Sequence, residues 1–166
     1  YEIKEIFFLN SQIEGVFNPG SIKLNGQGKY SINNLDFLKL KFENYFSKEL
    51  SNLILNFEYN NGLNLDLINY KKNQKSIANI YLDLKKTKDI IEIKKLSFEE
   101  KKNIINLNNI IIKNNDILSF KKIEVVTSNN NFIIENNKKI FVKGAKFDAT
   151  NLPKFLSSDS NKNIFK

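Results

Sequence analysis

Residues 53–67 read Leu53-Ile54-Leu55-Asn56-Phe57-Glu58-Tyr59, then Asn60-Asn61-Gly62, then Leu63-Asn64-Leu65-Asp66-Leu67. Apolar and mostly polar side chains alternate on both sides of Asn61-Gly62, which is the two-residue period of a half-buried strand. Asn-Gly between two such runs is a strong hairpin signal, because Gly and Asn adopt the positive φ of a tight turn. The stretch therefore predicts a β-hairpin with one apolar face.

The same alternation recurs along most of the chain, for example over Ile22–Ile32 and Ala78–Leu84. Polar segments rich in Asn, Asp, Lys or Gly separate the runs, and we expect turns there. These are Asn18-Pro19-Gly20, Thr87-Lys88-Asp89, Glu99–Asn103 and Asn114-Asn115-Asp116. Short strands at such regular spacing predict a mainly β protein: an antiparallel meander forming a curved, twisted sheet, an open trough or a sandwich.

A few segments depart from the simple alternation. Tyr1–Phe17 holds an apolar cluster that predicts a short strand, and mixed spacing over Glu43–Ser51 predicts one helical turn. The parity slips between Phe120 and Ile123, which predicts a bulge or bend at Lys121-Lys122. Helical spacing of Leu152, Phe155 and Leu156 predicts a short C-terminal helix.

Residues 1–166 form one β-rich segment, since no linker divides them. Methionine is absent even at position 1, so we expect a fragment of a longer, multi-unit protein. The formal charge is +8, yet all 26 basic residues are lysine. Arginine is preferred for bidentate phosphate and guanine contacts, so its absence argues against a nucleic-acid partner. A lysine-rich binder of nucleic acid or anionic membranes is the weakest alternative.

The sequence lacks the usual catalytic residues. It has no His and no Cys, which removes the commonest general base, the thiolate nucleophile and the usual zinc ligands. Carboxylates remain as Glu99-Glu100, Asp36 with Glu43, and Asp83 with Asp89, but each lies in an expected turn or on a polar strand side and is expected to be solvated. We therefore expect no enzyme, no cofactor, and no catalytic, cofactor-binding or metal-binding residue.

The remaining candidate for function is the apolar face of the predicted strands. Without long amphipathic helices to cover it, this face must either form a packed core or bind an apolar ligand such as acyl chains. The candidate lipid-facing residues are Leu53, Leu55, Phe57, Leu63, Leu65, Leu67, Ala78, Ile80, Leu82 and Leu84.

Near the C-terminal end, Phe141-Val142-Lys143-Gly144-Ala145-Lys146-Phe147-Asp148-Ala149 is followed by Thr150-Asn151-Leu152-Pro153-Lys154-Phe155-Leu156. This strand with Gly-x-x-Phe-Asp-Ala before a short Leu-containing helix resembles the segment that closes one β-rich unit before the next in the AsmA-like superfamily. The resemblance is notably to the YhdP-type relatives of TamB and AsmA in Gram-negative bacteria. Asn106–Ile112 followed by Asp116–Ile123 is similar to that family's short strands.

The resemblance implies a segment of a large periplasmic protein of the cell envelope, anchored in the inner membrane through a helix outside this piece. It implies a β-sheet trough that carries phospholipid toward the outer membrane, with phospholipid acyl chains and adjacent β-units of the same parent chain as partners. No catalytic residue is implied. The alternative is a structural or adhesin-like β-domain with a closed core.

Overall fold

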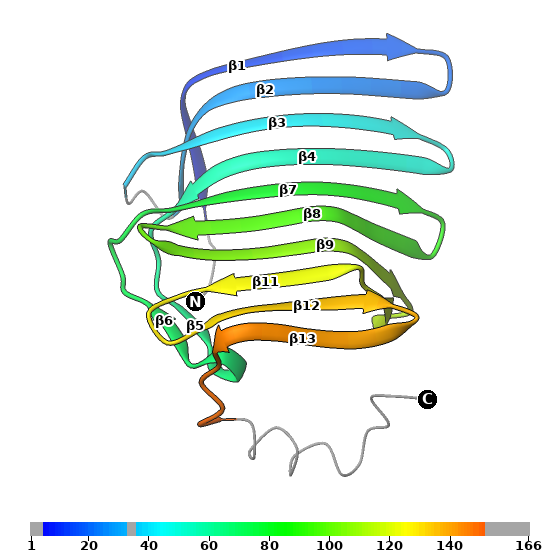
Figure 1. The fold of residues 1–166 in the computed structure, drawn as a ribbon. Helices are drawn as coiled ribbons and strands as arrows, with labels where there is room; N and C mark the ends of the chain where they lie inside the picture. Colours follow the sequence, from blue (N-terminus) through cyan, green and yellow to red (C-terminus); the bar gives the residue numbers. More distant parts are fainter. Residues whose placement is uncertain (1–4, 33–35, 152–166) are drawn as a thin grey trace.

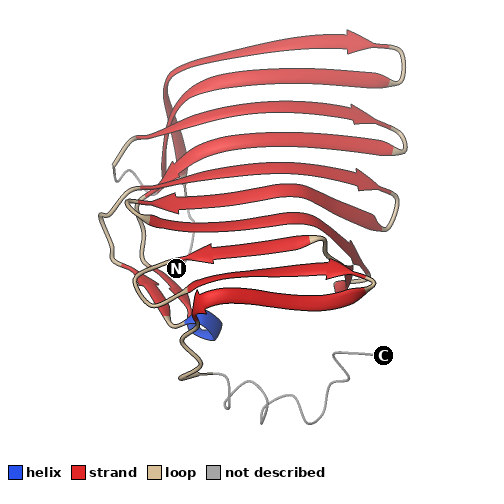
Figure 2. Ribbon diagram, in the orientation of Figure 1, coloured by secondary structure: helices blue, strands red, loops and turns tan. Residues whose placement is uncertain are grey.

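The computed structural model describes residues 5–32 and 36–151, and Figure 2 shows this part of the chain as almost entirely strand. A single 3-10 turn, η1 (Asp66–Ile68), is the helical element of these described residues. The strands are β1 (Ile6–Asn18), β2 (Ser21–Ile32), β3 (Leu38–Ser47), β4 (Leu50–Tyr59), β5 (Leu63–Leu65), β6 (Tyr70–Lys72), β7 (Ala78–Thr87), β8 (Ile90–Glu100), β9 (Asn103–Lys113), β10 (Asp116–Ser119), β11 (Lys122–Val126), β12 (Asn131–Asn137) and β13 (Lys139–Lys146).

Eleven strands form one open sheet in the order β1-β2-β3-β4-β7-β8-β9-β11-β12-β13, with β10 also paired to β9. Every pairing is antiparallel, and Figure 1 shows the strands stacked from β1 at one edge to β13 at the other without closure. The small pair β5–β6 is separate. The predicted mainly β, antiparallel fold is confirmed, and of the shapes that the sequence left as alternatives the described sheet is an open one, not a sandwich.

The hairpin turns lie where the sequence predicts them. Gly20 has a φ of 81° directly after Pro19, the conformation that a type II turn requires at its third residue. Asn114 and Asn115 have φ values of 51° and 67°, as in the type I′ turns that match the twist of a hairpin. Lys88 is also left-handed, with φ of 53°.

The predicted hairpin over residues 53–67 is wrong. β4 pairs with β3 and β7, while β5 pairs with β6, so the two halves of the stretch belong to different sheets. Gly62 lacks the positive φ of a tight turn, since Gly20 is the described glycine that has one. The linker is held by other residues instead: Lys75 N–H donates to the Asn60 carbonyl at 2.7 Å.

Other local predictions have mixed outcomes. The helical turn over Glu43–Ser51 is wrong, because β3 runs on to Ser47 and β4 begins at Leu50. The N-terminal strand is 13 residues long rather than short. The break at Lys121-Lys122 is confirmed, since it separates β10 from β11 on the same side of β9. The helix predicted near Leu152–Leu156 lies outside the described residues.

The sheet has one apolar and one polar face, because directly paired residues share a face and successive residues alternate. One row across five central strands is Phe42, Leu55, Leu82, Leu96 and Leu107. The neighbouring row on the other side is Lys41, Asn56, Tyr81, Ser97 and Asn106. We call these sides the apolar face and the polar face.

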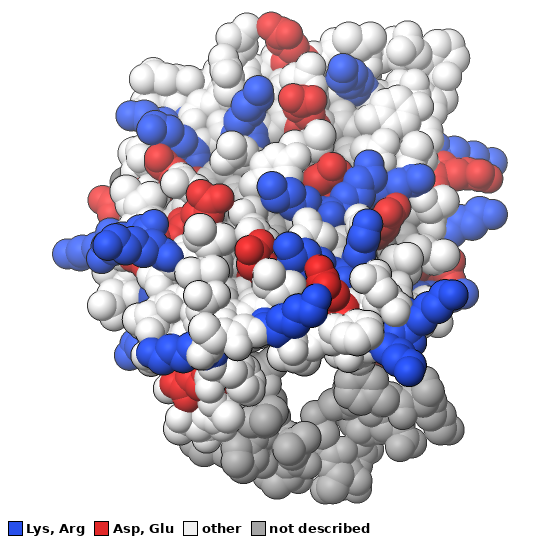
Figure 3. All heavy atoms as spheres, in the orientation of Figure 1, with Lys and Arg blue, Asp and Glu red and all other residues white. Residues whose placement is uncertain are grey.

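Figure 3 shows lysine and carboxylate side chains interspersed over the visible surface of the sheet. Ion pairs on the polar face include Lys39–Glu58 at 3.4 Å and Lys94–Asp83 at 3.8 Å. Such solvent-exposed pairs contribute ~1 kcal/mol or less each. The polar face therefore keeps the sheet soluble more than it stabilises it.

β13 begins and ends with lysine, and the backbone of β12 lies close to it at Gly144. A Cβ on Gly144 would lie 2.7 Å from the Cα of Phe132 and closer still to the Asn131 carbonyl, where the register of the two strands shifts. Backbone cannot move aside as a side chain can. Gly144 therefore permits this bulged pairing.

Gly144→Ala is expected to lower the free energy of unfolding by about 1–3 kcal/mol, the usual cost of overpacking. The measurement is urea unfolding, with hydrogen exchange of the β13 amides as the local readout. Gly62→Ala is the matched control, because the nearest atom to its added Cβ is the Lys72 carbonyl oxygen at 3.7 Å. Equal stability of the two variants would contradict the close approach of β12.

Candidate functional site

The apolar face consists mainly of aliphatic and aromatic side chains, most of them half-buried rather than enclosed, and it is interrupted by Asn44 between Leu24 and Leu53. In the central strands it consists of Leu40, Phe42, Leu53, Leu55, Phe57, Ile80, Leu82, Leu84, Ile93, Leu96, Leu107 and Ile110. Toward the edges it becomes more exposed: Ile13 on β1 and Val142 on β13 are 64% and 65% exposed. Soluble monomers seldom expose an apolar surface of this extent.

The structure places seven of the ten candidate lipid-facing residues together on this face. Leu53, Leu55 and Phe57 on β4 lie directly opposite Leu84, Leu82 and Ile80 on β7, and Ala78 lies opposite Tyr59. These side chains form adjacent rows between two neighbouring strands. Only Ala78 among them is fully buried.

The other three candidates lie in a separate element, which we call the hairpin cap: residues 63–72, comprising β5, η1 and β6. Leu63 and Leu65 belong to the separate β5–β6 pair and not to the apolar face, and they pack against the buried cluster that the cap forms with the large sheet. Leu67 lies in η1 and is 48% exposed. The sequence pattern identified their periodicity but not their partner.

The hairpin cap covers one end of the apolar face. Its Ile68 and Tyr70 form a buried cluster with residues of the sheet, namely Ala78, Phe98, Ile105, Val125 and Phe132. The rings of Tyr70 and Phe98 meet edge to face, with centroids 5.8 Å apart. This cluster is the dry core of the described chain, and it occupies the end of the sheet near the β8–β9 turn.

Glu100 is a buried carboxylate beneath the cap. It accepts hydrogen bonds from the Ser76 hydroxyl, from Asn103 Nδ2 at 2.7 Å and from the Tyr70 hydroxyl at 3.2 Å. The Ser76 hydrogen bond is the main cause that holds the pKa of Glu100 below its ordinary value of 4.5. Burial and the Glu100 charge raise the pKa of Tyr70. The expectation that Glu100 is solvated is therefore wrong.

Lys72 is also buried, at 1% exposure. Its ammonium group donates to the carbonyl oxygens of Asn61 at 2.8 Å and Asn73 at 3.2 Å, and lies 5.3 Å from the Tyr59 ring centroid. Burial lowers the pKa of Lys72, and the charge of Glu100 opposes that shift. Lys72 thus fastens the cap to the linker that follows β4.

Asn130 joins the cap to the C-terminal end of the described chain. It is fully buried, donates through Nδ2 to the Ile68 carbonyl at 2.7 Å, and accepts from the Asp148 amide at 2.9 Å. Asp148 in turn accepts from Asn69 Nδ2 at 2.9 Å. Sequence reasoning missed Lys72 and Asn130, because lysine and asparagine are abundant everywhere in this chain.

Glu100→Gln is expected to lower the free energy of unfolding by about 1–3 kcal/mol at neutral pH, because it weakens charge-assisted hydrogen bonds at a buried site. A folded-state pKa below the ordinary one means that the ionised carboxylate stabilises the fold above pH 4.5, and that this contribution is lost as pH falls through the folded-state pKa. The difference between wild type and variant should therefore shrink below pH 4.5. Urea unfolding across pH measures it.

The matched control is Glu99→Gln, the same change on the adjacent, exposed residue of β8. This variant should be nearly neutral in stability. A pH-independent loss in Glu100→Gln would show that the carboxylate charge does not matter and that only its shape does.

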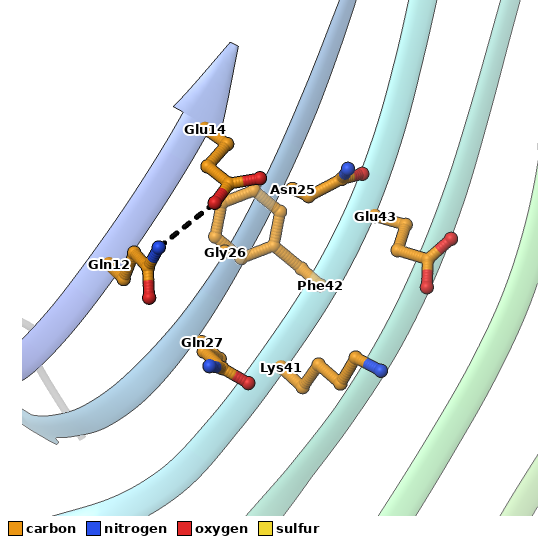
Figure 4. Close-up of a pocket in the computed structure, with 8 residues that line it drawn as sticks. All are labelled: Gln12, Glu14, Asn25, Gly26, Gln27, Lys41, Phe42 and Glu43. Carbon is orange, nitrogen blue, oxygen red and sulfur yellow. Dashed lines mark hydrogen bonds between the residues drawn. The ribbon is translucent and has the colours of Figure 1, made fainter.

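An open hollow of about 260 Å³ lies between β1 and β3 and is lined mostly by side chains of the polar face, together with Gly26 and Phe42, as Figure 4 shows. Gln12 Nε2 donates to Glu14 Oε1 at 2.9 Å on one side, and Lys41 and Glu43 lie on the other. No reactive group is held in a defined geometry there. We therefore interpret the hollow as a shallow, solvent-exposed depression of the surface.

The carboxylate pairs considered from the sequence are not brought together as catalytic pairs. Asp83 pairs with Lys94 and Asp89 with Lys113, at 3.8 Å and 3.3 Å. Asp36 accepts a hydrogen bond from Asn60 Nδ2 at 2.8 Å, whereas Glu43 lies on β3 and lines the hollow between β1 and β3. Within residues 5–32 and 36–151, no three His, Cys, Asp or Glu side chains gather as metal ligands would.

Comparison of the chain with protein-family models, with curated proteins and with solved structures found no match. Among the described residues there is no helix with the length and hydropathy to cross a membrane. The class that the fold and the candidate site define is therefore a structural one: an open antiparallel sheet with one apolar face and a hairpin cap at one end.

Proposed function

We propose that this chain is a non-catalytic segment of a cell-envelope protein whose apolar face binds phospholipid acyl chains during transport between the inner and outer membranes. The observation that carries the proposal is the half-buried apolar surface of the central strands, which the cap covers at only one end. A surface of this kind is stable in water when an apolar ligand or partner covers it.

Acyl chains match this surface in chemistry and in energy. Each buried methylene contributes ~0.8 kcal/mol, so contact with roughly ten methylenes gives on the order of 8 kcal/mol. Part of that is offset by the free-energy cost of association. The result is a reversible complex, which a transport protein needs because it must also release its lipid.

The proposed location is the periplasm, with the parent protein anchored in the inner membrane. This location is what the resemblance of residues 141–156 to the AsmA-like superfamily implies. Phe147 and Asp148 of that stretch contact Phe132 and Asn69, so its Phe-Asp pair joins β13 to the cap. These contacts support the interpretation of the stretch as the closing element of a β-unit.

The two sheet edges support adjacent β-units of the same parent chain as partners. β1 has no lysine over 13 residues and exposes Ile6, Phe8, Ile13 and Phe17. β13 carries Lys139, Lys143 and Lys146. Edge strands that remain unpaired are usually short or carry charged side chains, so the long apolar β1 is the better candidate for pairing with a further strand.

A lipid-transfer assay tests the proposal. The protein is incubated with phospholipid vesicles that carry an acyl-labelled fluorescent phospholipid, separated from the vesicles, and assayed for fluorescence. We expect stoichiometric label on the protein. Protein that stays free of label at all vesicle concentrations would contradict the proposal and leave the structural or adhesin-like β-domain, for which the dry cluster beneath the cap is the supporting observation.

A further inference from the structure

The apolar face is polarised in charge along the strand direction. Of the residues paired on it in the register of the large sheet, two are charged. Glu100 is buried beneath the hairpin cap, and Lys86 lies at the opposite end, one residue before the last pair of β7 and β8. The other paired lysines and carboxylates of this sheet lie on the polar face.

Lys86 lies among uncharged neighbours. The residues directly opposite it are Ser51 on β4 and Ile91 on β8. Among the described residues no carboxylate lies within ion-pair distance of its ammonium group, and the side chain is exposed. The neighbouring Lys85 differs, since it belongs to the polar face opposite Asn52 and Glu92.

The rim that holds Lys86 is the open end of the apolar face. In Figure 1 the β1–β2, β3–β4, β7–β8 and β12–β13 turns all lie along this side, opposite the cap. Near the β1–β2 turn, Phe17, Ile22 and Phe46 line an open hollow of about 400 Å³. Apolar side chains therefore reach this rim without a covering element in the described chain.

The length of the open face suits a long acyl chain. Ile80, packed against the cluster beneath the cap, lies on β7 six residues before Lys86. At about 3.3 Å per residue these positions are roughly 20 Å apart. One leaflet accounts for about 15 Å of a bilayer's hydrocarbon core of roughly 30 Å. An acyl chain can thus lie between the cap and Lys86.

We propose that the apolar face selects an anionic phospholipid and orients it, with the headgroup phosphate beside Lys86 at the open rim and the acyl chain directed toward the hairpin cap. This inference rests on the proposed function and names its substrate class. Among the described residues paired on this face, Lys86 is the cation without a carboxylate partner, so it attracts an anionic headgroup to the open rim. At the capped end the Glu100 carboxylate is ion-paired with Lys101 at 3.6 Å and the hairpin cap covers the face, so no free cation is offered to a phosphate there. The reverse orientation places the headgroup against the dry cluster.

The test compares phosphatidylglycerol and phosphatidylcholine with identical acyl chains, each carrying the same acyl fluorophore, in the vesicle assay and at low salt. Wild type is expected to bind phosphatidylglycerol about two- to fivefold more tightly, the size that one partly exposed charge contact supports. Lys86→Glu should abolish this preference. Lys85→Glu, with the same net charge but on the opposite face, should retain it, and circular dichroism checks that both variants fold.

The outcomes separate the two proposals. Binding of both lipids with no headgroup preference, or an equal effect of Lys86→Glu and Lys85→Glu, overturns the orientation while lipid binding itself stands. Binding of neither lipid by the wild type overturns the proposed function and this inference together. A preference lost in Lys86→Glu alone supports both.

Discussion

Phe132→Ala is expected to lower the free energy of unfolding by about 3–5 kcal/mol, the usual cost of removing a buried aromatic ring. Phe132 is 4% exposed and belongs to the cluster that joins the sheet to the hairpin cap. Its ring also meets that of Phe147 edge to face, with centroids 5.0 Å apart. Removing it leaves a cavity beneath the cap and deprives the C-terminal end of the described chain of its packing partner.

The measurement is urea unfolding followed by circular dichroism, with Phe46→Ala as the matched control. Phe46 lies on the same face but at the open rim, where it is 38% exposed. Its loss should cost about 1 kcal/mol or less, because a side chain that stays in contact with water loses less on truncation. Similar losses of free energy of unfolding in the two variants would mean that the dry core does not lie beneath the cap. That result would contradict the division of the apolar face into a covered end and an open end.

The faces of the strands were predictable because a two-residue period assigns a side chain to a face whatever strand lies next to it. Leu53, Leu55, Leu82 and Leu84 share a face for this reason. The period says nothing of which strands pair. Asn61-Gly62 looks like a hairpin turn locally, but pairing of β4 with β7 aligns two long apolar rows, whereas pairing with the three-residue β5 aligns much less.

The contacts that hold the cap were not predictable from local pattern. Glu100 ends β8 in a segment whose charged sequence predicts only a turn, and its partners Tyr70 and Ser76 are 30 and 24 residues away in sequence. Asn130 reaches Ile68 across 62 residues. Such contacts are set by how the cap docks, and neither lysine nor asparagine stands out in a chain where both are common. The sequence holds one weak indication of the cap's packing: Tyr70 and Lys72 are alternate residues, so they share one face if this segment is a strand.

Leu55→Asp is expected to weaken binding of the acyl-labelled phospholipid at least about tenfold, which corresponds to about 1.4 kcal/mol. Leu55 lies in the middle row of the apolar face, between Phe42 and Leu82, and is half-buried without being enclosed. In the unbound protein an aspartate there stays hydrated, so the sheet should still fold. A bound acyl chain must displace that water, and an unpaired carboxylate is costly to desolvate.

Asn56→Asp is the matched control, since it adds the same charge one residue along β4 on the polar face. It should bind lipid as the wild type does, and Leu82→Asp, opposite Leu55, should reproduce the loss. If the face is instead covered as an ordinary core, Leu55→Asp will unfold the sheet by several kcal/mol, because the carboxylate is then buried without a partner. A folded Leu55→Asp variant that still binds lipid fully would exclude the apolar face as the binding surface. The two interpretations of this face therefore predict different effects of Leu55→Asp. A lipid-binding face predicts a folded protein that has lost its ligand, and a packed core predicts an unfolded one. Urea unfolding and the lipid assay together distinguish them.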